Sequence, residues 1–146
     1  MAKVMTLGQM VECRQILKSE GNKVVFTNGC FDILHLGHVQ YLEQARALGD
    51  ILVVGLNGDA SVRRLKGDKR PIMGEDERAQ ILAALWSVDY VVIFDDDTAE
   101  PLVAALQPDI YVKGGDYADG RDLPEAGIVR GYGGRVSLLP FVTGHS

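Results

Sequence analysis

Two histidines separated by two residues follow the first strongly apolar segment of the chain. The apolar residues 24–27 lead into a loop that contains Gly29, and His35 and His38 stand where a helical pattern then begins. Residues three apart in the first turn of a helix share one face, and Gly37 leaves that face uncovered. A helix N-terminus also supplies unpaired backbone N–H groups and a positive dipole end. Two imidazole donors at such a point indicate a site for a phosphate, above all one that gains charge in a transition state.

A structural role and a metal site are the two other interpretations of these histidines. Capping or packing is the ordinary role of an isolated His-x-Gly-His sequence. Together with Cys30, the two histidines would give three zinc ligands, but no further residues with the spacing of a zinc site accompany them. Their place directly after a strand, with a basic segment expected at the same edge, favours the phosphate.

That basic segment is residues 63–70, "RRLKGDKR", which follows the second apolar segment. A run of charge is often only a solvated surface. Here Gly67 and Pro71 interrupt it, which is typical of a loop that closes over a ligand. Lys66 and Arg70 are therefore predicted to bind phosphate.

Arg78 and the segment "VKGGDY" give weaker indications of ligand binding. Arg78 lies one turn into an acidic helix, where pairing with Glu75 or another acidic neighbour is nearly as well supported as ligand contact. Lys113, Gly114 and Asp116 belong to "VKGGDY", in which adjacent glycines would let a base or ribose lie against the backbone.

Three consecutive aspartates, residues 95–97, would suit a magnesium site. A helix start is the favoured interpretation, with Asp97 or Thr98 as the cap.

Apolar segments and helical patterns alternate along the chain, which predicts one α/β domain over residues 1–146, with residues 1–22 forming an N-terminal helical segment. Strands that are apolar throughout imply a Rossmann-like, doubly wound sheet of about five parallel strands with helices on both faces. Ligands bind such sheets beyond the carboxyl ends of the strands, where the polar residues above collect. Strands are expected at 23–27, 50–57, 90–94, 110–114 and 135–141, and helices at 7–19, 39–48, 59–67, 75–87, 98–106 and 124–132.

Composition disfavours several classes of protein. The chain has 146 residues and a formal net charge of −5, and it lacks the basic stripe of a nucleic-acid binder. No apolar run approaches the length of a membrane span, and the first residues do not form a signal peptide. With only two cysteines, Cys13 and Cys30, we expect a cytoplasmic, reducing setting.

The stretches "FTNGCFDILHLGHVQYL" and "PDIYVKGGDY" carry a resemblance to the cytidylyltransferase-like nucleotidyltransferase superfamily, which extends over residues 23–146. "NGCFD" together with "KGGDY" resembles the heptose 1-phosphate adenylyltransferases within it. The resemblance implies direct in-line transfer of AMP from ATP to a sugar 1-phosphate, with release of pyrophosphate and no covalent enzyme intermediate. It implies Mg²⁺ carried mainly by the ATP phosphates, with no metal site on the protein.

The resemblance also implies roles for individual residues. His35 and His38 would hold the α- and β-phosphates, and Lys66 and Arg70 would close over them. The sugar phosphate would meet Asp32, Asn57 and Arg78. The nucleotide would be bordered by Thr27, Asn28, Gly29, Phe31, Gly37, Lys113, Gly114, Asp116, Gly144 and Ser146.

Two alternative functions stay open. One is a cytidylyltransferase acting on glycerol 3-phosphate or a similar phosphorylated alcohol, and the other is a nucleotide-binding domain without turnover. The final helix of the superfamily is expected to be absent, because the sequence ends at "FVTGHS". Relatives are usually homo-oligomers, so we expect an oligomer, a dimer above all, with Trp86 and Tyr90 either at its interface or in the core.

Overall fold

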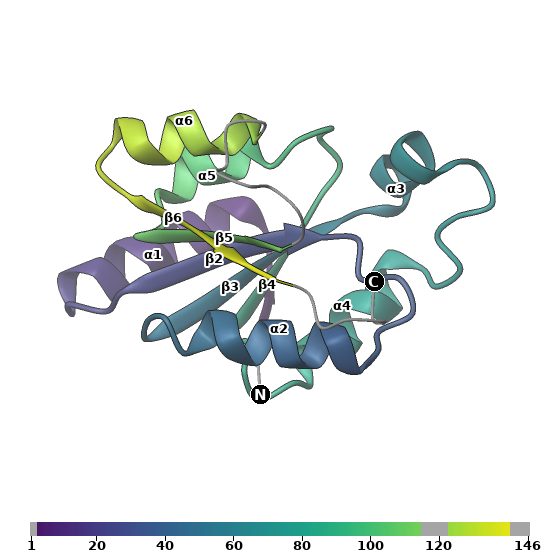
Figure 1. The fold of residues 1–146 in the computed structure, drawn as a ribbon, viewed down its shortest axis with the longest axis horizontal. Helices are drawn as coiled ribbons and strands as arrows, with labels where there is room; N and C mark the ends of the chain where they lie inside the picture. Colours follow the sequence, from purple (N-terminus) through teal and green to yellow (C-terminus); the bar gives the residue numbers. More distant parts are fainter. Residues whose placement is uncertain (1–2, 115–122, 141–146) are drawn as a thin grey trace.

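The computed structural model describes residues 3–114 and 123–140, which form a six-stranded sheet with helices between the strands (Figure 1). All neighbouring strands pair in parallel, in the order β1-β4-β3-β2-β5-β6. The elements are β1 (Lys3–Met5), α1 (Leu7–Ser19), β2 (Val24–Gly29), α2 (Leu36–Arg46), β3 (Ile51–Asn57), α3 (Asp59–Lys66), α4 (Glu75–Ala83), β4 (Tyr90–Phe94), α5 (Glu100–Leu106), β5 (Ile110–Gly114), α6 (Pro124–Gly131) and β6 (Arg135–Leu139).

Both faces of the sheet are apolar because successive strand residues point to opposite sides. In β2, Val24 and Phe26 pack with helices α1, α5 and α6, whereas Val25 packs with α2 and α4. Figure 1 shows these two helical layers on either side of the sheet, with α3 standing apart at one end. The predicted doubly wound α/β fold is confirmed.

The sheet gains a strand that the sequence pattern did not predict. β1 is an edge strand of three residues, paired with Tyr90–Val92 of β4, and its side chains are exposed or half-buried. Because it has no apolar run of its own, it left no signal for a buried strand. The observed sheet therefore has six strands where about five were expected.

Several helix boundaries differ from the predicted ones. α2 spans Leu36–Arg46 where 39–48 was expected, because its N-cap is His35. α4 ends at Ala83, four residues before the predicted end, because the backbone turns there and the N–H of Ala84 bonds to the carbonyls of Gln80 and Ile81. The N-cap of α5 is Ala99, so neither Asp97 nor Thr98 is the cap. Thr98 still serves the first turn, since its Oγ1 accepts from the N–H of Glu100 at 3.3 Å.

The strand order reverses at β2. β3 and β4 lie on one side of it, and β5 and β6 lie on the other. The ladder between β2 and β5 is short: only Val25↔Ile110 and Phe26↔Tyr111 are in register, against six pairs between β2 and β3. The carboxyl ends of the two strands are thus free to diverge, which is where ligands bind in such sheets.

Candidate active site

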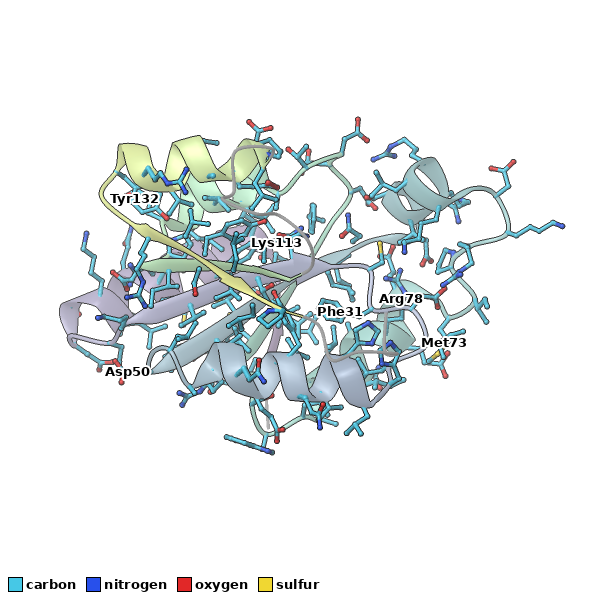
Figure 2. The ribbon with its side chains drawn as sticks, in the orientation of Figure 1. Phe31, Asp50, Met73, Arg78, Lys113 and Tyr132 are labelled. Carbon is cyan, nitrogen blue, oxygen red and sulfur yellow. The ribbon has the colours of Figure 1, made fainter. Side chains whose placement is uncertain are left out.

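A pocket of about 860 Å³ opens at this switch point. Its walls come from the carboxyl ends of four neighbouring strands, together with the loops that follow them. The strand residues that line it are Asn28 and Gly29 of β2, Asn57 of β3, Phe94 of β4, and Lys113 and Gly114 of β5. Phe31, Met73 and Arg78 lie at this end of the sheet, whereas Asp50 and Tyr132 lie at the opposite end (Figure 2).

The two histidines begin helix α2 and cap it. His35 is the N-cap, and its Nδ1 accepts from the N–H of Gly37 at 3.1 Å. His38 Nδ1 accepts in turn from the N–H of His35 at 3.3 Å. The rings stack with centroids 3.9 Å apart, so the prediction that they share a face is confirmed. Because each Nδ1 is an acceptor, each neutral ring carries its proton on Nε2, which makes Nε2–H a donor.

His38 stays neutral over the physiological range. Burial lowers its pKa to about 4, with further contributions from the charges of His35 and Lys66. The Phe31 ring packs against it in a T-shaped arrangement, with centroids 5.3 Å apart. Capping, one of the two other roles considered for the motif, is thus present, and it fixes which nitrogen is available as a donor.

The basic loop reaches the same pocket. Lys66 ends helix α3, and Gly67 then turns the chain with a φ of 100°, a conformation that favours glycine. Lys66 and Arg70 both line the pocket alongside His35 and His38. The structure therefore brings together the four residues for which catalysis was predicted, although the roles themselves remain predictions.

Asp32 holds that loop in place. Its carboxylate accepts from Arg70 Nε at 2.7 Å, from the N–H of Ile72 at 2.8 Å and from the N–H of Met73 at 3.0 Å. Burial by itself would raise the pKa of Asp32, but the two backbone hydrogen bonds and the Arg70 guanidinium outweigh it and lower the pKa. Asp32 lines the pocket, yet its oxygens are engaged by the protein. Asn57 also lines the pocket, with its Nδ2 donating to Ser61 Oγ at 2.8 Å.

Arg78 occupies a different place from the predicted one. Its side chain is buried and does not line the pocket, and it pairs with Asp59 rather than with Glu75. It donates to the carbonyls of Met73, Cys30 and Asn57 and to Asp59 Oδ1, at 2.7 to 2.9 Å. This geometry gives no support to a contact with the sugar phosphate.

A sequence signal for the buried position of Arg78 existed. Arg78, Leu82 and Leu85 follow one another at helical spacing, so the arginine stands on the apolar stripe of its own helix. An arginine on such a stripe is buried, and buried arginine needs partners for its N–H groups.

The predicted nucleotide side is only partly assembled around the pocket. Asn28, Gly29, Phe31, Lys113 and Gly114 line it. Thr27 does not, because it is fully buried and its Oγ1 is bonded to Tyr41 Oη at 2.7 Å. Gly37 does not line it either and contributes its N–H to the helix cap. Asp116, Gly144 and Ser146 lie outside the described residues.

Side chains join β2 to β5 where their ladder stops. Tyr111 Oη donates to Asn28 Oδ1 at 2.6 Å, and Lys113 Nζ donates to the Asn28 carbonyl at 3.4 Å. Burial lowers the pKa of Lys113, opposed by the nearby carboxylate of Glu125. Glu125 is itself a buried pocket residue that the sequence did not single out, since an acid after Pro124 reads as an ordinary first-turn residue.

The residues present fit a metal carried by the nucleotide better than one held by the protein. Within residues 3–114 and 123–140, no group of three His, Cys, Asp or Glu side chains is placed to hold a metal ion. The zinc interpretation therefore gains no support there, and burial raises the pKa of the Cys30 thiol, against the charges of Lys66, Arg78 and Lys113. Mg²⁺ binds through one or two carboxylates plus substrate phosphates. The pocket lining holds three basic side chains, Lys66, Arg70 and Lys113, and three acidic ones, Asp32, Asp97 and Glu125.

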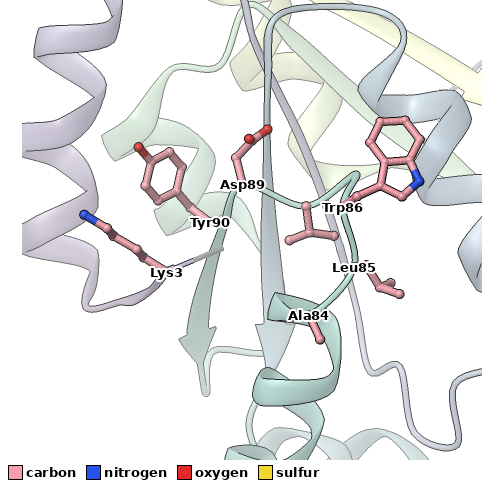
Figure 3. A pocket seen from close by; sticks show the side chains of 7 residues that line it. Lys3, Ala84, Leu85, Trp86, Asp89 and Tyr90 are labelled. Atoms are coloured by element: carbon pink, nitrogen blue, oxygen red, sulfur yellow. The ribbon is translucent and has the colours of Figure 1, made fainter. Parts of the chain in front are cut away.

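A second cavity, of about 500 Å³, lies at the opposite edge of the sheet, before β4 (Figure 3). Leu85 and Trp86 line one side of it, and Lys3 and Tyr90 line the other. Trp86 is 74% exposed, so of the two places considered for it the core is excluded. Its Nε1 donates to Glu43 Oε2 at 3.1 Å.

In the part of the chain that the structure describes, no helix has both the length and the apolar character needed to cross a membrane.

Curated relatives match nearly the whole chain. "Bifunctional protein HldE" of Pelobacter propionicus is 62% identical over 88% of this chain and 26% of its own length. The protein of the same name from Geobacter sulfurreducens is 56% identical over 99% of this chain and 29% of its own length. The chain thus spans less than a third of the length of these relatives.

Solved structures show the same fold. A lipopolysaccharide core biosynthesis protein from Thermoplasma volcanium is 31% identical with a TM-score of 0.68, over 84% of this chain and 98% of that one. A pantoate–β-alanine ligase from Francisella tularensis, 15% identical with a TM-score of 0.64 over 96% of this chain and 67% of that one, shares the fold alone. The model of the cytidylyltransferase-like family matches residues 26–131, which include both histidines, the basic loop and the end of β5. The chain therefore belongs to the cytidylyltransferase-like family and is a nucleotidyltransferase.

Proposed function

We propose that the chain transfers AMP from ATP to D-glycero-β-D-manno-heptose 1-phosphate, giving ADP-heptose and pyrophosphate for lipopolysaccharide core synthesis. The observation that carries the proposal is the pair of Nε2–H donors of His35 and His38 in one pocket with Lys66 and Arg70. The sequence resemblance supplies the sugar, and the likeness to a lipopolysaccharide core biosynthesis protein of Thermoplasma volcanium supports the pathway.

The chemistry is one displacement. An oxygen of the sugar phosphate forms a bond to the α-phosphorus of ATP while the bond from that phosphorus to the α–β bridging oxygen breaks. The electron pair of the broken bond leaves on pyrophosphate. No nucleophile on the protein is required, so the protein contributes positioning and stabilisation of charge.

The histidines and the basic loop would supply that stabilisation. Nε2–H of His38 is a neutral donor because its pKa is about 4, and donation needs no change in protonation during the reaction. Its hydrogen bond to a phosphate oxygen would strengthen as charge accumulates there. Lys66 and Arg70 would neutralise the outer phosphates. Mg²⁺, when bound with ATP, would supply further charge neutralisation between phosphates.

The remaining pocket walls would position the nucleotide and the sugar. Asn28, Gly29, Phe31, Lys113 and Gly114 would border the nucleotide, and Asn57 would meet the sugar phosphate. For Asp116, Gly144 and Ser146 the predicted contacts remain predictions.

The test is pyrophosphate release with Mg²⁺ and heptose 1-phosphate, offered with ATP or CTP in separate reactions. We expect release with ATP, and a fall in kcat of roughly a hundredfold or more in both His35→Ala and His38→Ala, as for loss of an oxyanion donor. Ile16→Ala, at an exposed position of α1, is the control and should keep full activity.

Two outcomes would replace the proposal. Release only with CTP and glycerol 3-phosphate would make the chain a cytidylyltransferase for a phosphorylated alcohol. Binding of ATP without pyrophosphate release on any phosphorylated acceptor would make it a nucleotide-binding domain without turnover.

A further inference from the structure

Asp32 is a buried carboxylate in the wall of the pocket for which phosphate binding is proposed. Only 2% of its side chain is exposed, compared with 36% of the Arg70 side chain that it contacts. A carboxylate at the wall of a phosphate site would repel the ligand unless its charge were compensated. Here three donors compensate it: Arg70 Nε, the N–H of Ile72 and the N–H of Met73. The same bonds lower its pKa, so the carboxylate is ionised and only weakly basic near neutral pH.

The bond to Arg70 uses Nε, which is the inner nitrogen of the guanidinium. An Nε contact at 2.7 Å fixes the plane of the group while the outer nitrogens stay outside the ion pair. Arg70 lines the pocket, so the fixed group belongs to its wall. A long, flexible side chain held in this way loses less freedom when a phosphate arrives.

The hydrogen bonds from the backbone to the Asp32 carboxylate fix the chain segment that follows Arg70. Ile72 and Met73 follow Arg70 closely in the chain, and the N–H of Arg70 bonds to the Gly67 carbonyl at 3.1 Å. One carboxylate therefore anchors both the side chain of Arg70 and the segment that carries it.

We propose that Asp32 is a positioning residue that holds Arg70 ready for the phosphates, and that it acts on the transfer through Arg70 and not by touching the substrate. The proposal rests on the proposed function. It replaces the direct contact with the sugar phosphate that the sequence predicted for Asp32.

A double-mutant cycle tests this dependence. Asp32→Ala, Arg70→Ala and the double variant are compared by kcat and by KM for ATP and for heptose 1-phosphate. We expect each single variant to lower kcat/KM roughly tenfold or more, and the loss caused by Asp32→Ala to be at least about fivefold smaller when Arg70 is already alanine. Equal losses in the two backgrounds, or no loss in Arg70→Ala, would overturn the proposal.

A matched control lies at the opposite edge. Arg46 Nε contacts Asp89 Oδ2 at 3.0 Å, and Asp89 also accepts from the N–H of Leu52 at 2.8 Å. Asp89→Ala should lower the melting temperature without changing kcat/KM at an assay temperature well below melting. If Asp32→Ala behaves in the same way, its role is only structural and the proposal fails. Asp32→Asn, which keeps the side-chain volume, replaces Asp32→Ala if circular dichroism shows that the alanine variant is unfolded.

Failure of the proposed function gives a different result. In that case the wild-type protein releases no pyrophosphate from ATP and heptose 1-phosphate. The cycle is then measured on the dissociation constant of a fluorescent ATP analogue, where the effect of Asp32→Ala should again be small in the Arg70→Ala background. Independent effects on that binding would overturn the positioning role.

Discussion

Replacing Arg78 by methionine should destabilise the protein more than any exposed substitution, although Arg78 does not line the pocket. The residue is 1% exposed, and its side chain is the largest of the fully buried side chains among the described residues. Its guanidinium joins the loop before α2, through Cys30, to the segment that follows the basic loop, through Met73. It also holds the end of β3, through Asn57, and the start of α3, through Asp59.

The magnitude follows from what the substitution leaves unpaired. Four hydrogen bonds from a charged group, at about 1.5–3 kcal/mol each, would sum to roughly 6–12 kcal/mol. The partners lie at strand ends and loops that can turn toward water, and breaking a buried ion pair costs about 3–5 kcal/mol in practice. We therefore expect a loss of about 4 kcal/mol in the free energy of unfolding. For a domain of this size, that corresponds to a melting temperature lower by about 12 °C.

Urea and thermal unfolding, followed by circular dichroism, measure this loss. Arg64→Ala is the control, because Arg64 pairs with Asp97 at the surface, where their side chains are 48% and 75% exposed. Such an exposed pair contributes at most about 1 kcal/mol. A loss below about 1 kcal/mol in Arg78→Met would refute the reasoning, since it would mean that the four contacts do not hold the loops together.

Three further predictions follow from titration and packing. The pKa of His38 falls from 6.5 to about 4 on folding, so the unfolded chain binds more protons between pH 4 and 6.5. The stability of the wild type relative to His38→Asn should therefore rise from pH 4 to 6.5 and then stay level. A stability difference that falls with rising pH would contradict the neutral ring. Because burial raises the pKa of the Cys30 thiol, iodoacetamide should alkylate it more slowly at pH 7.5 than it alkylates free cysteine. The Cys30→Ser variant identifies which of the observed alkylation belongs to Cys30. Alkylation at the rate of free cysteine would show that the thiol is not desolvated. A Cβ on Gly49 would lie 2.8 Å from Val25 Cγ2 and 2.9 Å from the Lys23 carbonyl, so Gly49→Ala should lower the free energy of unfolding by about 1–3 kcal/mol. Gly127→Ala is the control and should not destabilise the protein, because a Cβ there meets nothing within 4 Å. Equal stabilities of the two variants would show that the backbone at Gly49 shifts to accommodate the methyl group.

The sequence was sufficient for five of the six strands of the described sheet, β1 being missed, and for the edge at which the candidate site lies. β4 and β5 were predicted with their observed ends, because short, wholly apolar runs bounded by turns leave little choice of register. The shared face of His35 and His38 followed from their spacing. In each case the information is local, within a few residues of the chain.

The sequence pattern could not predict hydrogen bonds and ion pairs between residues that are far apart in the chain. Asp32 looks like a ligand contact until its partners 40 and 41 positions away are known. Arg78 forms its ion pair with Asp59, on another helix, and not with Glu75, which belongs to the same helix as Arg78. Thr27 belongs to the stretch that carries the family resemblance, but its buried hydroxyl is hydrogen-bonded to Tyr41 Oη. Polar residues near a site divide into those that touch ligand and those that hold the others, and only three-dimensional packing separates the two.

The short ladder between β2 and β5 has a consequence for how the protein opens. Two register pairs join the halves of the sheet at the strands beneath the pocket, whereas β3 and β4 share five pairs and β5 and β6 share five. A nucleotide bound across this seam would bridge segments from Asn28 to Glu125 and so oppose separation of the halves. Ligand binding energy would then appear as resistance to unfolding, by RT ln(1 + [L]/Kd), and amide hydrogens on both sides of the seam would exchange more slowly together. The two strands of the described sheet that share the fewest register pairs are thus the ones that a bound nucleotide would hold together.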